Sequence, residues 1–111
     1  MTGLASRFGG IPRHASWRGR SGRSYSLLAE RMDVFSLTPG ALYLVAKGSI
    51  VLWVGSAEDV ISDQQSRARF RLALAAADRA FLVEGAESEE KRLATVWDLE
   101  GAEPEAGLSA A

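Results

Sequence analysis

The 111-residue sequence contains no cysteine, which excludes disulfide bonds, cysteine-ligated zinc and a thiol nucleophile. It has one histidine and lacks the G-x-S-x-G elbow of serine hydrolases. It also lacks the phosphate-binding glycine loops of nucleotide-binding enzymes. No apolar run approaches the roughly 20 residues that a membrane-spanning helix needs. The first residues include arginines with no apolar segment behind them, so no secretory signal is predicted. We therefore expect a soluble, cytoplasmic protein with no membrane partner.

The composition itself is ordinary, with an apolar share of 47%, a charged share of 24% and a formal net charge of −1. A chain of this length forms one domain. The small net charge hides a gradient, because residues 1–24 hold five arginines and no acid, whereas residues 84–111 hold eight acids and two basic residues. A basic arm of this kind suits nucleic acid, but it equally suits docking on the acidic end or solubility alone.

The pattern of apolar residues predicts an α+β fold. Segments 41–46 and 50–55 are rich in strand-forming residues, and the Lys47-Gly48 pair between them suits a tight hairpin. Segment 79–84 is predicted to add a third strand, which gives a small three-stranded antiparallel sheet. Both hairpin strands are apolar on both faces, so we expect helices on both sides of the sheet.

Two helices are predicted around the third strand. Ser62 and Gln65 form a capping-box pattern at the start of a helix over 63–78. Its core face is expected at helical spacing, formed by Phe70, Ala73, Leu74 and Ala77. A second helix over 87–99 begins with acids, and its buried stripe is expected to consist of Leu93, Val96 and Trp97.

The remaining segments define the domain boundaries. Residues 1–24 are rich in glycine and have no apolar periodicity, which predicts a disordered basic arm whose Phe8 and Trp17 could stack on nucleic-acid bases. The single domain is expected over 25–104, followed by a disordered acidic tail over 105–111. Within the domain, the segment from Tyr25 to Leu37 suits either a short helix or an extended arm.

Two triplets on the predicted hairpin carry a family resemblance. Ala41-Leu42-Tyr43 lies on the first strand, and Trp53-Val54-Gly55 lies on the second, with ten residues from one aromatic to the other. The helix that follows carries Arg67 and, one turn later, Arg71. This order and spacing resemble the signature of the GIY-YIG nucleases over about residues 40–84.

The resemblance implies metal-assisted hydrolysis of a DNA phosphodiester. Tyr43 would help to position water, Arg67 would stabilise phosphate charge, and Glu90 is the nearest candidate to hold a divalent cation such as Mg²⁺. However, Trp53 stands where the family has a second tyrosine, and an indole N–H cannot act as a base. The resemblance therefore implies a nucleic-acid-directed domain whose nuclease activity is lost or weak. Its DNA-binding residues would be Trp53, Gly55, Arg67 and Arg71.

Each of these residues also has a purely structural interpretation. Tyr43 and Trp53 suit core aromatics packed against a helix, Gly55 suits a strand end, and Arg67 and Arg71 suit a solvated helix flank. The alternative function is a protein-interaction module with no nucleic-acid role. In that case the segment from Tyr25 to Leu37, or the acidic C-terminal end, would engage a protein partner.

Overall fold

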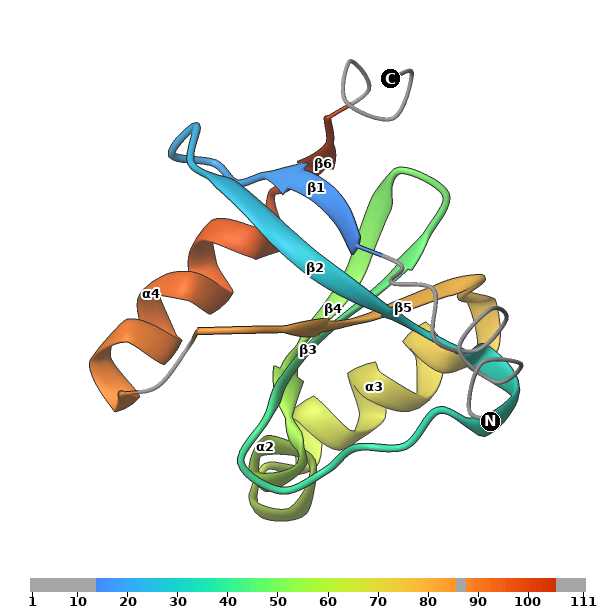
Figure 1. Cartoon of the computed structure of the whole chain (residues 1–111). Helices are drawn as coiled ribbons and strands as arrows, with labels where there is room; N and C mark the ends of the chain where they lie inside the picture. The colour runs from blue at the N-terminus through green and yellow to red at the C-terminus, as the bar shows by residue number, and fades with distance from the viewer. Residues whose placement is uncertain (1–13, 86–87, 106–111) are drawn as a thin grey trace, which may run out of the picture.

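The computed structural model describes residues 14–85 and 88–105. Within these ranges, six strands form one antiparallel sheet in the order β4-β3-β5-β2-β1-β6, and the sheet curves into a half-barrel (Figure 1). The strands are β1 (His14–Arg18), β2 (Ser24–Glu30), β3 (Leu42–Lys47), β4 (Ile50–Ser56), β5 (Arg79–Val83) and β6 (Glu103–Pro104). The helices are the 3-10 turn η1 (Met32–Val34) and the α-helices α2 (Ala57–Ser62), α3 (Gln64–Ala76) and α4 (Glu89–Glu100).

The α+β class is confirmed, but the prediction of a small three-stranded sheet is wrong. Strands β3, β4 and β5 lie close to the predicted positions, and β5 pairs with β3. However, the other edge of β5 pairs with β2, and β1 and β6 follow. The added strands lie at the two ends of the chain, where the sequence has little apolar periodicity.

The predicted disorder of the basic arm is wrong for residues 14–24. These residues form β1 and the turn into β2, and Trp17 pairs with Tyr25 across the hairpin. Trp17 is fully buried in the core, so its ring cannot stack on bases. Burial of this one large side chain offsets the ordering of a glycine-rich turn. Residues 1–13, including Phe8, and residues 106–111 of the predicted tail lie outside the described residues.

Of the two interpretations of the segment from Tyr25 to Leu37, the extended one is confirmed. It begins in β2 and continues through the short turn η1. In the turn itself no residue is buried. The segment then runs over the outer face of the sheet, where Phe35 and Leu37 pack against buried side chains.

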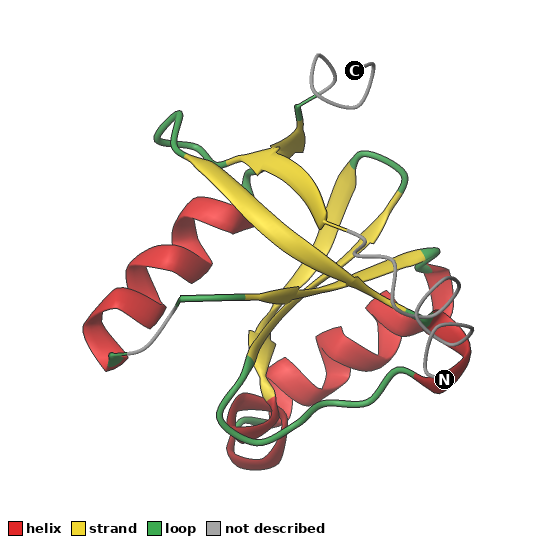
Figure 2. Cartoon of the chain, in the orientation of Figure 1, coloured by secondary structure: helices red, strands yellow, loops and turns green. Residues whose placement is uncertain are grey.

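The two faces of β3 contact different apolar clusters, as its sequence predicts. Leu42, Leu44 and Ala46 point into the inner core, where α4 contributes Leu99 and Val96. Tyr43 and Val45 point to an outer cluster beneath α3. The helices accordingly lie on both sides of the yellow strands in Figure 2. The expected helix cover on both faces of the hairpin is therefore confirmed.

The helices differ from the prediction in their caps. Helix α2 was not predicted, and it has a true capping box, formed by Ser56 and Asp59. Helix α3 begins with Asp63 as its N-cap, so the predicted box of Ser62 and Gln65 is wrong. On α3, Phe70 and Ala73 pack on the outer cluster as expected, as does the C-cap residue Ala77, whereas Leu74 is 37% exposed.

The predicted stripe of α4 is wrong for two of its three residues. Leu93 and Trp97 are 66% and 57% exposed. The buried side chains are instead Thr95, Asp98 and Leu99. The helix is rotated relative to the prediction because its inner face meets polar groups of the β1–β2 hairpin as well as the core. No helix among the described residues is long and apolar enough to cross a membrane.

Candidate functional site

Three of the residues predicted to form a nuclease-like site lie together. Tyr43 is opposite Gly55 in the pairing of β3 with β4. The indole of Trp53 covers Gly55 so closely that an added Cβ would lie 2.5 Å from a ring carbon. The side chains of Tyr43 and Trp53 are only 3% and 5% exposed. The hydroxyl of Tyr43 accepts a hydrogen bond from the backbone N–H of Thr38 at 3.1 Å.

Other aromatic rings enclose these residues. Phe35 packs edge-on against Tyr43, with 5.4 Å between ring centroids, and Phe70 lies 4.6 Å from Trp53. The structural interpretation of Tyr43 and Trp53 as core aromatics is therefore confirmed. Because other rings cover them, neither offers a free ring face on which a base could stack.

The charged residues of the predicted site lie on two helices on opposite sides of the sheet. Arg67 is half-buried and Arg71 is exposed, both on α3, which packs on the same cluster as Tyr43. Glu90 is exposed in the first turn of α4, which packs on the opposite cluster. Within residues 14–85 and 88–105, no three histidine or acidic side chains are grouped so that they could hold a metal ion. Glu90 lies on the side of the sheet opposite to Tyr43 and Arg67, so the structure does not bring together the residues of the implied Mg²⁺ site.

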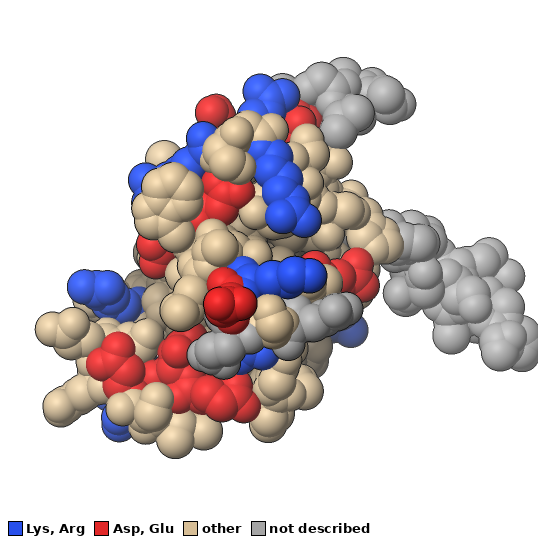
Figure 3. All heavy atoms as spheres, turned by 90° about the vertical axis from the view of Figure 1, so that its left-hand side faces the viewer, with Lys and Arg blue, Asp and Glu red and all other residues tan. Residues whose placement is uncertain are grey.

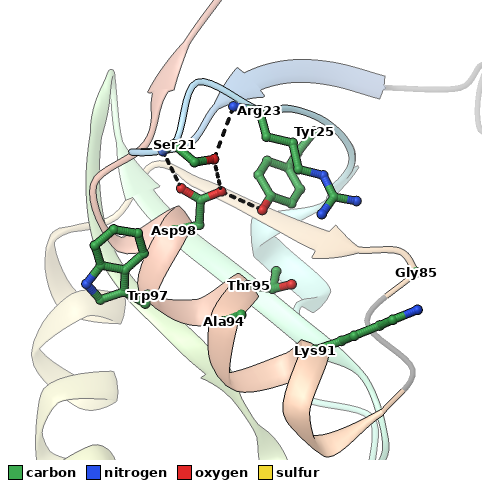
Figure 4. A pocket seen from close by; sticks show the side chains of 9 residues that line it. All are labelled: Ser21, Arg23, Tyr25, Gly85, Lys91, Ala94, Thr95, Trp97 and Asp98. Atoms are coloured by element: carbon green, nitrogen blue, oxygen red, sulfur yellow. Dashed lines mark hydrogen bonds between the residues drawn. The ribbon is translucent and has the colours of Figure 1, made fainter.

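A second group of polar side chains surrounds a pocket of about 430 Å³ between the β1–β2 hairpin and α4, which we call the hairpin–α4 pocket (Figure 4). The hairpin supplies one wall and α4 the other, and Gly85, which follows β5, lines one side. The lining residues are Ser21, Arg23, Tyr25, Gly85, Lys91, Ala94, Thr95, Trp97 and Asp98. The pocket therefore joins segments from both ends of the chain.

Asp98 is the centre of the hydrogen bonding in this pocket. Its carboxylate accepts hydrogen bonds from the backbone N–H and the hydroxyl of Ser21 and from the hydroxyl of Tyr25, each at 2.7 Å. The backbone N–H of Arg20 donates to the carbonyl of Asp98 at 3.0 Å. Gly19 leaves room for the carboxylate, since an added Cβ would lie 2.5 Å from it. Asp98 thus fastens the hairpin to α4.

The same contacts move two pKa values in opposite directions. Burial alone would raise the pKa of the Asp98 carboxyl, but the hydrogen bonds from Ser21 and Tyr25 outweigh it, so this pKa lies below its usual range. Burial raises the pKa of the Tyr25 hydroxyl, and its hydrogen bond to the Asp98 carboxylate raises it further. Asp98 is therefore held charged and Tyr25 neutral near pH 7.

Two arginines of the hairpin stack on aromatic rings beside the pocket. The guanidinium of Arg20 lies 5.1 Å from the ring centre of Trp97, and its Nε donates to the Trp97 carbonyl at 2.8 Å. The guanidinium of Arg23 lies 5.1 Å from the ring centre of Tyr25. In Figure 4, Arg23 and Lys91 extend toward Gly85, whereas Trp97 lies on the other side of α4. Two cation–aromatic pairs thus flank the Asp98 cluster.

The electrostatics of this side of the molecule follow the hairpin. Figure 3 shows lysine and arginine side chains on the upper part of this face, where the β1–β2 hairpin lies, with acidic side chains more frequent below. Arg18 is neutralised by Glu105 at 3.1 Å. Arg20, Arg23 and Lys91 outnumber the single Asp98 carboxylate around the opening.

The sequence-based reasoning missed the residues of the hairpin–α4 pocket. One signal was present, because Arg20-Ser21-Gly22-Arg23 has the composition of a turn. Gly22 indeed adopts a positive φ of 91° in that turn. No local pattern predicts that Asp98 is buried, since an acidic residue in a helix is normally expected to be solvent-exposed.

No protein-family model, curated protein or solved structure matches this chain. The resemblance to the GIY-YIG nucleases therefore stays a prediction.

Proposed function

We propose that the chain binds single-stranded nucleic acid on the surface around the hairpin–α4 pocket. The observation that supports this most is the pair of guanidinium groups stacked on Trp97 and Tyr25, each 5.1 Å from the ring centre. Aromatic and guanidinium planes stack on bases irrespective of sequence, and the same guanidinium groups can meet phosphates. A duplex hides its base faces, so the ligand expected here is a single strand.

The charges of the surface suit the phosphate backbone. Arg23 and Lys91 line the pocket and Arg20 lies at its edge, whereas the carboxylate of Asp98 is bonded to Ser21 and Tyr25. Stacking on Trp97 and Tyr25 already holds Arg20 and Arg23 in place, so binding costs little side-chain entropy. The proposed role of Asp98, with its hydrogen-bond partners Ser21 and Tyr25, is to position these cations.

This proposal keeps the predicted class of ligand and moves the surface. The resemblance to the GIY-YIG nucleases implies DNA at Trp53, Gly55, Arg67 and Arg71, and the aromatic rings at that location are buried. Arg71 remains exposed on α3, away from the hairpin. A substitution of Arg71 therefore distinguishes binding at the α3 surface from binding at the hairpin–α4 pocket. Hydrolysis by Tyr43 and Arg67 with Mg²⁺ at Glu90 is not part of the proposal.

The test is the fluorescence anisotropy of a short labelled single strand, compared with the same strand in a duplex, over a series of salt concentrations. We expect the single strand to bind more tightly and its affinity to fall steeply with salt, because phosphate contacts release counterions. Trp97→Ala is expected to weaken binding about tenfold, the usual value of one stacked base. Arg23→Ala is expected to reduce both the affinity and the salt slope.

Arg71→Ala is the matched control, since it removes an exposed arginine outside the proposed surface. Its affinity for the single strand should equal that of the wild type. If Arg71→Ala weakens binding while Trp97→Ala and Arg23→Ala do not, the α3 surface is the correct one and this proposal is wrong. Absence of binding at low salt would rule out both surfaces.

A further inference from the structure

The hairpin–α4 pocket has two cationic side chains at one of its ends. Arg23 comes from the hairpin wall and Lys91 from the α4 wall, and both extend toward Gly85 (Figure 4). Among the described residues, Asp98 is the one acid that lines the pocket, and it lies beside Ser21, away from Gly85. A ligand group that lies beside Gly85 therefore meets two positively charged side chains.

The space beside Gly85 is open. Gly85 adopts a positive φ of 88°, and a Cβ added there would meet no other atom within 4 Å. On the α4 wall, Ala94 is small and exposed. The pocket volume of about 430 Å³ lies within the range of sites that hold a whole small ligand. The pocket therefore has room for a complete nucleotide.

Lys91 lies at a position where a lysine does not stabilise its helix. It is in the first turn of α4, and its backbone N–H donates to the hydroxyl of the N-cap residue Ser88 at 3.1 Å. A cation in the first turn is unfavourable, because the helix dipole is positive at that end. Such conflicts with a local preference are typical of functional sites. The dipole and the ammonium group together favour an anion at this end of the pocket.

The two cations suit a terminal phosphate better than a phosphate within a strand. A phosphate within a strand carries one negative charge, whereas a phosphate monoester carries about 1.5 to 2 at pH 7. The guanidinium of Arg23, stacked on Tyr25, can donate two parallel hydrogen bonds to phosphate oxygens, and the ammonium of Lys91 adds a point charge. We infer that the hairpin–α4 pocket binds the terminal phosphate of the single strand. This inference rests on the proposed function.

A strand whose end lies in the pocket can continue to Trp97. Lys91, Ala94 and Trp97 follow one another at a spacing of three residues on α4, so they are neighbours on the helix surface. Figure 4 shows Ala94 between the other two. The ring of Trp97 is 57% exposed. One strand can therefore place its terminal phosphate at Lys91 and stack a base on Trp97.

The test compares three forms of one internally labelled single strand, which carry a 5′-phosphate, a 3′-phosphate or hydroxyl groups at both ends. We expect one phosphorylated form to bind about tenfold more tightly than the hydroxyl form, because hydrogen bonds between charged groups are stronger than neutral ones. The form that binds more tightly identifies the end of the strand. The amide chemical shifts of Gly85 and Lys91 should change more with that form than with the hydroxyl form.

Lys91→Gln removes the charge and keeps most of the length of the side chain. It should reduce the preference for the phosphorylated form to below about twofold, since the ammonium no longer pairs with the phosphate. Lys47→Gln is the matched control, because Lys47 is the only other lysine of the chain and is exposed. Lys47 ends β3 beside the start of β5, whereas Gly85 follows the end of β5. This control should leave the preference unchanged.

Failure of this inference differs from failure of the proposed function. If the hydroxyl form binds and neither phosphorylated form binds more tightly, the pocket does not recognise a terminal phosphate, while the proposed function stands. If no form binds at low salt, both are wrong. A preference that Lys91→Gln leaves unchanged would place the phosphate elsewhere and overturn the inference. A nucleoside monophosphate that binds as tightly as the phosphorylated strand would also overturn it, since the pocket would then bind a free nucleotide.

Discussion

The β3–β4–α3–β5 half of the molecule and the β1–β2–α4–β6 half are held together by different interactions. In the first half, apolar and aromatic side chains pack on one another, from Tyr43 and Trp53 on the sheet to Phe70 on α3. In the second, Trp17 supplies the apolar contact and Asp98 supplies the polar one. A short stretch of sequence is enough to reveal apolar periodicity. It does not reveal that the carboxylate of Asp98 binds Ser21, which lies 77 positions away.

The largest expected effect tests whether residues 14–18 belong to the inner core. Trp17 is fully buried and packs edge-on against Phe81, with 5.6 Å between ring centroids. Trp17→Ala should lower the free energy of unfolding by about 4 kcal/mol, as is usual when a large core aromatic is removed. Urea denaturation followed by circular dichroism measures it.

Trp97→Ala is the control for this measurement, because Trp97 is 57% exposed and the same chemical change there removes little buried area. Its effect should stay below about 1 kcal/mol. If Trp17→Ala were no more harmful than Trp97→Ala, residues 14–18 would belong to a loose arm, and the contrast between the two halves would disappear.

A smaller effect tests whether the hydrogen bonds to the Asp98 carboxylate stabilise the second half. Asp98→Asn keeps the shape of the side chain and removes the charge that three donors share. We expect a loss of about 2.5 kcal/mol, within the range for hydrogen bonds to a charged group. Tyr25→Phe removes one of these bonds and should cost about 1 kcal/mol. Equal losses for the two variants would show that Tyr25 alone fastens the hairpin.

The smallest effect concerns charge alone and appears as pH dependence. The pKa of Asp98 is lower in the folded protein than in the unfolded chain, so the unfolded chain binds more protons between these two values. The stability that Asp98 contributes is therefore present above its unfolded pKa, about 3.9, and is lost as the pH falls through its folded pKa. The difference in stability between wild type and Asp98→Asn should narrow below about pH 4. A constant difference down to acidic pH would mean that the hydrogen-bond geometry, and not the charge, stabilises the hairpin.

The same contrast explains how much could be predicted. The hairpin over 41–55, the helix after it and the strand near 79 follow from apolar runs, a turn glycine and helical spacing, and these elements are present. Trp17 was missed because a single aromatic among glycines has no period. The stripe on α4 was misplaced because Asp98, which reads as a solvent-facing residue, is buried. Of the predicted site, the grouping of Tyr43, Trp53 and Gly55 is present, but their burial depends on Phe35 and Phe70, which no local pattern connects to them.

Strand β5 has a consequence for the order in which the chain can fold. It is the strand that pairs with both β2 and β3, yet it follows them in the sequence, after α3. The β1–β2 and β3–β4 hairpins can each form from local contacts while the chain is synthesised. Until residue 83 has emerged, however, the apolar edges of β2 and β3 have no neighbour. A stalled or truncated chain that ends before β5 should therefore aggregate through those edges, whereas the full-length chain covers them with its own strand.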